Sequence, residues 1–169
     1  MNDRLVLTEA TRVRIVTEKT DFNEFYRAEA DRLARALALA LGDVDLAQEA
    51  VDEGMARAYQ RWRKVGAYQS PAGWVYRVSL NWARNRVRNR RREVLTSDWA
   101  EESFSHEIDP DLERALESLS IDARSVVVLR YLLGWSTAEA AHALGVGEGT
   151  VKSRLSRALE RLETLLEER

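Results

Sequence analysis

Residues 134–166 read GWSTAEAAHALGVGEGTVKSRLSRALERLETLL, and this stretch decides the fold of the C-terminal part of the chain. Ser136 and Glu139 have the spacing of a capping box, which starts a short helix. The two alanines that follow Glu139 are small enough for another helix to approach closely, and Gly145 permits a tight turn. The pattern predicts a helix-turn-helix.

The second helix of this motif has two chemically different faces. A rotation of about 100° per residue gathers one polar stripe and one apolar side. The apolar side must pack on the rest of the domain, while the stripe is basic near the end where a recognition helix meets base edges and phosphates. An amphipathic helix with solvated arginines is the alternative, but the capping box and turn glycine favour DNA as the partner. The stripe holds Thr150, Ser153, Arg154, Arg157 and Arg161, and the apolar side holds Val151, Leu155, Leu159, Leu162 and Leu166.

Length and composition describe a folded protein of ordinary size. The chain has 169 residues, of which 45% are hydrophobic, so disorder throughout is excluded. The absence of cysteine excludes a disulfide framework, a thiolate metal site and a thiol nucleophile. The N-terminus lacks the continuous apolar core of a signal peptide, and no run of about 18 apolar residues occurs. We expect a soluble cytoplasmic protein without membrane insertion.

The net charge of −2 hides a strong segregation of charge along the chain. Residues 21–92 carry 14 basic and 9 acidic side chains, a balance of +5, whereas residues 93–122 carry 1 basic and 10 acidic side chains, a balance of −9. Such asymmetry fits a nucleic-acid binder with a local footprint. It predicts two folded parts on either side of an acidic connector.

Hydrophobic periodicity predicts helices throughout and no pair of strands, so we expect an all-α fold of two small helical domains. Asp21 and Glu24 form a capping box that opens a first helix, which Gly42 ends. A second helix is expected over residues 45–62, and a third from Pro71, capped by Ser70, to residue 92. Shorter helices are expected near 111–119 and 123–133. The expected boundaries are an N-terminal extension at 1–20, a first domain at 21–92, an acidic linker at 93–110 and a helix-turn-helix domain at 111–169.

The third helix carries an unusual mixture of aromatic, amide and arginine side chains. Its polar stripe consists of Arg77, Asn81, Arg84 and Arg88, bordered by Trp74. Six of the nine residues from 84 to 92 are arginine, and a polyanion would relieve their mutual repulsion. Arginine neutralises phosphate, amides can donate to base edges and aromatic rings can stack on an unstacked base. A solvated charged helix end is the alternative for this segment taken alone.

Three segments in this order resemble the bacterial sigma-70 family, within it the small two-domain extracytoplasmic-function (ECF) group of RNA polymerase sigma factors. They are GDVDLAQEAVDEGMARAYQRW at 42–62, SPAGWVYRVSLNWARNRVRNRRR at 70–92 and VVVLRYLLGWSTAEAAHALGVGEGTVKSRLSRALERL at 126–162. The resemblance implies a factor that binds core RNA polymerase and directs promoter-specific initiation. It assigns residues 21–92 to sigma region 2 and residues 111–169 to sigma region 4.

The resemblance also implies roles for individual residues. In this family the second helix docks on the clamp helices of the largest polymerase subunit, the third helix and the loop before it recognise the melted −10 element, and the terminal helix reads the −35 element. The polymerase-binding positions are Gln48, Glu49, Asp52, Glu53 and Arg57; the −10 positions are Tyr68, Trp74, Arg77, Asn81, Arg84 and Arg88; the −35 positions are Thr150, Lys152, Ser153, Arg154 and Arg157. Lys152 lies off the main polar stripe, so we expect it on phosphate. Glu49, Asp52 and Glu53 form an acidic row on the second helix. Without the resemblance to the family, this row would be interpreted as a solvated helix face.

Two other functions compete with this hypothesis. A dimeric helix-turn-helix repressor or activator acting on duplex DNA without core polymerase would explain the terminal helix, but neither the acidic second helix nor the arginine-rich third one. An enzyme is disfavoured because the sequence shows no metal-ligand spacing, cofactor motif or nucleophile constellation. His106 falls in the linker and His142 reads as a surface residue. We therefore expect a non-enzyme without cofactor or metal, with core polymerase and promoter DNA as partners; an anti-sigma factor is left open.

Overall fold

The computed structural model describes residues 9–93 and 110–167, and these two stretches contain helices and no strand. The predicted all-α fold is confirmed. The predicted linker and His106 lie outside the described residues, apart from the linker's end residues. The N-terminal group consists of α1 (Glu9–Leu41), α2 (Val44–Gln60), α3 (Trp62–Val65) and α4 (Pro71–Glu93), and the C-terminal group of α5 (Pro110–Glu117), α6 (Ile121–Val127), the π-helical segment η1 (Val128–Leu132), α7 (Thr137–Leu144) and α8 (Glu148–Glu167).

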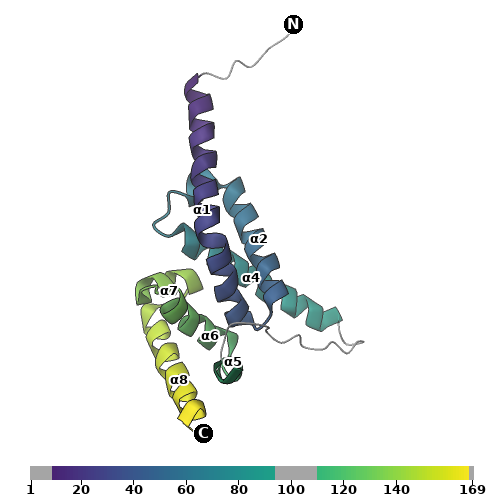
Figure 1. Ribbon diagram of the computed structural model, residues 1–169, viewed down its shortest axis with the longest axis vertical. Coiled ribbons are helices and arrows are strands. Elements are labelled where there is room, and N and C mark those ends of the chain that lie inside the picture. The colour runs from purple at the N-terminus through teal and green to yellow at the C-terminus, as the bar shows by residue number, and fades with distance from the viewer. Residues whose placement is uncertain (1–8, 94–109, 168–169) are drawn as a thin grey trace.

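Helix α1 is longer than the sequence predicted. It starts at Glu9 and projects beyond the other helices at its N-terminal end (Figure 1). The capping box expected at Asp21 and Glu24 is therefore wrong, because both residues lie inside a continuous helix whose backbone amides are already paired within it. The predicted end is confirmed, since Gly42 has φ 74° and its amide bonds the Ala38 carbonyl at 2.8 Å.

Helix α2 starts where Asp43 accepts a hydrogen bond from the Leu46 amide at 2.8 Å. It ends at Gln60, two residues before the predicted end, and Trp62 opens the separate short helix α3. The apolar residues of this segment are nevertheless buried together in the core: Leu46, Ala47, Ala50, Val51, Ala58 and Trp62.

Helix α4 crosses α2 at a close approach. Ser70 caps α4 by accepting from the Gly73 amide at 3.0 Å, and Pro71 is its first residue, both as predicted. Gly54 of α2 faces α4 so closely that a Cβ there would overlap Ser79 Oγ and lie 3.2 Å from Val75 Cγ1. Glycine thus allows the close spacing of the two helices that carry the predicted polymerase-binding and −10 positions.

The segment expected as one helix over 123–133 is divided. α6 ends at Val127, and η1 continues with a wider turn in which the Leu133 amide bonds the Val128 carbonyl at 3.1 Å. This five-residue spacing is that of a π-bulge, a feature that apolar periodicity does not reveal. The bulge leaves Tyr131 and Leu132 exposed while Leu129 and Leu133 stay in the core.

The predicted helix-turn-helix is confirmed. Ser136 Oγ accepts from the Glu139 amide at 3.1 Å, and Glu139 Oε2 accepts from the Ser136 amide at 2.7 Å, which completes the capping box. Gly145 ends α7 with φ 67°, in the left-handed region that glycine tolerates best. The alanines at 140 and 141 are buried, as close packing of the two helices requires.

The two helical groups pack on each other, which the sequence did not predict. One buried apolar cluster contains Leu33 and Leu37 of α1, Tyr76 of α4, Leu129 of η1 and Val151 of α8. Helix α6 lies against α1, and α7 lies against α4 (Figure 1). Within the described residues, no helix has the length and apolarity that a membrane span requires.

We predict that Gly54→Ala destabilises the fold by about 1–2 kcal/mol, because overpacking at the α2–α4 crossing outweighs the gain in helix propensity. Ser79 Oγ is buried without a hydrogen-bond partner, so Ser79→Ala should be neutral or stabilising on its own and should relieve Gly54→Ala in the double variant. Urea unfolding followed by tryptophan fluorescence measures both effects. Equal destabilisation by Gly54→Ala in the two backgrounds would contradict the steric account.

Candidate nucleic-acid interface

Helix α8 presents the polar stripe that the sequence predicted. Thr150, Ser153 and Arg157 are exposed, whereas Val151 and Leu162 are buried. Lys152 is exposed beside the stripe. Arg157 Nε donates to the Ser153 carbonyl at 3.1 Å, which holds the exposed arginine along its own helix. The five predicted −35 positions therefore lie at the N-terminal half of one helix, four of them exposed.

Arg154, the fifth position, is partly buried. Its Nη2 lies 3.2 Å from Oδ2 of Asp122, which belongs to the first turn of α6. The other carboxylate oxygen of Asp122 accepts from Nη2 of Arg84, a predicted −10 position on α4. One carboxylate thus bridges an arginine from each of the two stripes.

The other −10 positions lie along α4 and in the loop before it. Arg77, Asn81 and Arg88 are exposed, and Arg88 donates to Asn85 at 2.9 Å. The Arg77 guanidinium lies against the turn of the helix-turn-helix, because a Cβ at Gly145 would be 2.5 Å from its Nη2. Trp74 is half-buried against the core, and Tyr68 is exposed in the loop. The loop and the stripe together offer donors and one accessible ring on the side where α4 meets α7.

Tyr76 and Ser125 lie buried where α4 meets the C-terminal group. The Tyr76 ring makes an edge contact with Trp135 at a centroid distance of 6.0 Å. Burial raises the pKa of Tyr76 to about 12, against smaller lowering effects of the neighbouring Ser125 hydroxyl and the Arg84 guanidinium. The Tyr76 and Ser125 hydroxyls are neighbours, and neither has a hydrogen-bond partner outside this pair among the described residues. The phenol is neutral at physiological pH.

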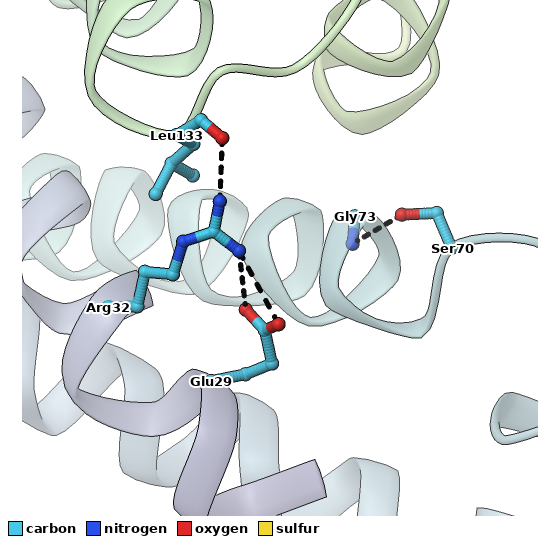
Figure 2. A network of polar contacts seen from close by, with 5 residues as sticks. All are labelled: Glu29, Arg32, Ser70, Gly73 and Leu133. Atoms are coloured by element: carbon cyan, nitrogen blue, oxygen red, sulfur yellow. Dashed lines mark hydrogen bonds and ion pairs between the residues drawn. The ribbon is translucent and has the colours of Figure 1, made fainter.

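A second contact joins the groups at α1. Arg32 Nη2 donates to the Leu133 carbonyl at 2.6 Å, and Arg32 Nη1 approaches Glu29 Oε2 at 3.4 Å (Figure 2). The same view shows Ser70 and Gly73 at the start of α4 below the C-terminal helices. The sequence did not single out Arg32 or Asp122. Each is one of many charged residues, and nothing in the sequence indicates its partner in the other helical group.

The acidic row on α2 lies away from this junction. Gln48, Glu49, Asp52 and Arg57 are exposed, and Glu53 is half-buried. Gln48 donates to Asp52 at 3.0 Å and Arg57 pairs with Glu53 at 2.7 Å, so four of the five predicted polymerase-binding positions form two polar pairs along the helix.

Comparison with known proteins decides the family. Residues 110–162 match the family model described as sigma-70, region 4. The ECF RNA polymerase sigma factor SigL of Mycobacterium tuberculosis is 37% identical over 138 residues, which span 75% of this chain and 78% of that protein. This chain belongs to the ECF RNA polymerase sigma factors. The RNA polymerase sigma-E factor of Streptomyces avermitilis is 35% identical over 158 residues, which span 90% of this chain and 88% of that protein.

A solved structure agrees with this assignment. The sigma factor RpoE of Bartonella quintana, in complex with the anti-sigma factor NepR, is 27% identical to this chain and superposes with a TM-score of 0.75. The match covers 87% of this chain and 97% of the RpoE chain. The chain is thus a transcription initiation factor that acts with core RNA polymerase on promoter DNA. The comparisons give no support to the dimeric repressor or activator.

We predict that the capping box of this sigma factor stabilises its helix-turn-helix in a pH-dependent manner. Hydrogen bonds from the Ser136 amide and hydroxyl lower the pKa of Glu139, so this contribution is present above the ordinary glutamate pKa and is lost as the pH falls through the lowered value. Ser136→Ala should cost about 1 kcal/mol at pH 7.

The stability difference between the wild type and Glu139→Gln should shrink on acidification to pH 3. Thermal unfolding at several pH values measures it, with Glu163→Gln, an exposed glutamate of α8, as the matched control. A Glu139→Gln difference that does not change with pH would rule out the carboxylate as the cause.

Proposed function

We propose that this sigma factor contacts a promoter through two surfaces, one on α8 and one on α4, while the polar face of α2 binds core polymerase. The observation that carries the proposal is the separation of these faces: two arginine-bearing stripes lie on two helices, and the acidic row lies on a third. A single-surface repressor has no use for the second stripe or the acidic row.

Helix α8 is proposed to read the −35 element as duplex DNA. Its exposed Thr150, Ser153 and Arg157 are followed by apolar residues that fix the helix in the domain, so the stripe can enter a major groove as one rigid unit. Arg154 joins them once Asp122 releases it, and Lys152 supplies a phosphate contact. Base contacts then give specificity and phosphate contacts give register.

Helix α4 and the loop before it are proposed to bind the melted −10 element. Asn81 is exposed between Arg77 and Arg84, so an amide that can donate and accept lies between two guanidinium groups. Guanidinium groups hold the backbone of a single strand, and the exposed ring of Tyr68 offers a surface on which an unstacked base can lie.

The α2 face is proposed to dock on the clamp helices of the largest polymerase subunit, through Gln48, Glu49, Asp52, Glu53 and Arg57. Its side chains pair along the helix at four-residue spacings, which pre-orders them before binding. We further propose that the protein acts in the cytoplasm and by binding alone, without catalysis. The likeness to a sigma factor captured with NepR supports an anti-sigma factor as an additional partner.

The decisive experiment for this proposal combines core polymerase with the full chain and sequences the transcripts made on fragmented genomic DNA. Transcript starts preceded by a shared pair of sequence elements are the expected result. Failure of the purified chain to bind core polymerase would end the proposal.

On a promoter found in this way, Arg157→Ala should weaken holoenzyme binding by about 1–3 kcal/mol and relax specificity within the −35 element, because a base contact is lost. Lys152→Ala should weaken binding evenly across sequences and lower the salt slope by about one. Filter binding at several salt concentrations measures both variants. Arg35→Ala, an exposed arginine of α1, is the control and should change neither quantity.

Asp52→Lys should weaken capture of core polymerase about tenfold, because it reverses a charge in the middle of the α2 face. Asp31→Lys introduces the same change at an exposed position of α1 and should leave capture unchanged. Equilibrium titration of labelled sigma factor with core polymerase measures the difference. Equal losses for the two variants would point to net charge instead of a docking face.

A further inference from the structure

The chain carries no acidic residue from position 54 to position 92, although it has 28 acidic and 26 basic side chains in all. This stretch contains 11 basic side chains, of which seven belong to α4 and one, Arg57, to the proposed polymerase-binding face. The functions proposed above leave the other three without a role. They are Arg61, Arg63 and Lys64, at the end of α2 and in α3, and we call them the α3 patch.

The short helix α3 turns the α3 patch outward. Trp62 and Val65 are buried, whereas the three basic side chains are exposed. The Trp62 ring packs on two rings of α1, at centroid distances of 5.2 Å from Phe22 and 4.9 Å from Phe25. This aromatic contact anchors α3 on α1 and leaves its basic residues in solvent.

Backbone contacts join the α3 patch closely to the loop that carries Tyr68. The Gly66 amide donates to the Trp62 carbonyl at 2.8 Å, and the Tyr68 amide donates to the Val65 carbonyl at 3.0 Å. A Cβ at Gly66 would lie only 3.0 Å from Cε2 of the Trp62 ring, so the loop follows α3 at the distance that glycine allows. The patch therefore continues the proposed −10 surface on the side of its loop away from α4.

The chemistry of the α3 patch fits a single strand of nucleic acid. Among the residues whose side chains the structure describes, no carboxylate pairs with Arg61 or Lys64, so both charges are available to a ligand. The exposed ring of Tyr68 follows the patch along the chain, and the ring of Tyr59, 50% exposed, precedes it by two residues. Basic side chains interleaved with accessible rings hold phosphates and unstacked bases together.

The layout of a promoter indicates which single strand this is. The −35 element is proposed to be read as duplex, so DNA on that side of the melted −10 element is double-stranded, and the strand stays single only on the downstream side, toward the transcription start. The arginine-rich end of α4 at residues 84–92 offers the larger charge, which suits a duplex with two phosphate backbones. A strand that occupies the α4 stripe and the loop then leaves past α3 at its downstream end.

We propose that the α3 patch binds the backbone of the melted strand immediately downstream of the −10 element, with Arg61, Arg63 and Lys64 on its phosphates. The inference rests on the proposed assignment of the −10 surface to α4 and its loop. Backbone contacts carry no sequence information, so the patch stabilises the melted promoter without selecting which promoters are used.

The test uses holoenzyme, formed from core polymerase and the full chain, with three single-stranded DNA probes. One carries the melted strand of the −10 element alone, and the other two add five thymidines at its downstream or its upstream end. Titration at several salt concentrations gives the slope of log affinity against log salt for each probe. Each phosphate contact on a single strand contributes about 0.7 to this slope.

The double variant Arg61→Gln with Lys64→Gln should lower the slope for the downstream-extended probe by about 1.4, because two phosphate contacts are lost. Its slopes for the other two probes should match the wild type. Arg27→Gln with Arg35→Gln removes the same charge from exposed positions of α1 and should change no slope. Arg61→Lys with Lys64→Arg keeps both charges and should behave like the wild type.

A wild-type slope for the double variant on the downstream-extended probe would overturn the α3 patch as a phosphate site. An equal loss on the upstream-extended probe would overturn its downstream placement, and an equal loss in the α1 control would point to net charge instead of a binding surface. Failure of wild-type holoenzyme to bind the −10 probe alone is a different result, which would reject the −10 surface and this inference with it.

Transcript mapping on fragmented genomic DNA separates backbone binding from sequence readout. Holoenzyme with Arg61→Gln and Lys64→Gln should use the same transcript starts as the wild type, with lower yield as the salt concentration rises. A changed set of promoters would contradict backbone binding by the α3 patch.

Discussion

The packing of α4 against both helical groups is the constraint on which the rest of the structure depends. Val75 and Leu80 of α4 lie in the core, and Gly54 allows α2 to approach without displacing them. Tyr76 is buried too, but its ring meets Trp135 of the C-terminal group. A helix with two buried sides has only a narrow strip left for polar residues, and that strip carries Arg77, Asn81 and Arg84. The apolar residues of α4 thus fix the direction of the proposed −10 surface.

Local signals in the sequence predicted the parts of the fold that depend on neighbouring residues. The capping box at Ser136 and Glu139 and the turn at Gly145 form because their partners lie within a few positions, whatever the rest of the chain does. The same signal failed at Asp21 because a cap competes with helix continuation, and the preceding residues continue the helix. A capping motif permits a helix to start at a residue but does not require it to start there.

The interactions that the sequence could not reveal are long-range or cumulative. Arg84 and Asp122 are 38 positions apart, and Arg32 and Leu133 are 101 apart, so no spacing rule connects them. The π-helical turn of η1 lengthens the backbone hydrogen-bond spacing from four residues to five, and the apolar pattern does not signal it because Leu129 and Leu133 would share a face of an ordinary α-helix as well. The promoter and polymerase positions were predicted from helical faces and family motifs, but the placement of these residues relative to one another required the structure.

The contacts that join the two helical groups are partly polar and partly apolar. Partly exposed ion pairs such as Arg84–Asp122 and Arg154–Asp122 contribute about 0–1 kcal/mol each, and salt weakens them. The Tyr76 and Ser125 hydroxyls are buried side by side, and their interaction with each other offsets only part of the cost of burying both. The apolar contacts of Trp135 and its neighbours must therefore supply most of the attraction.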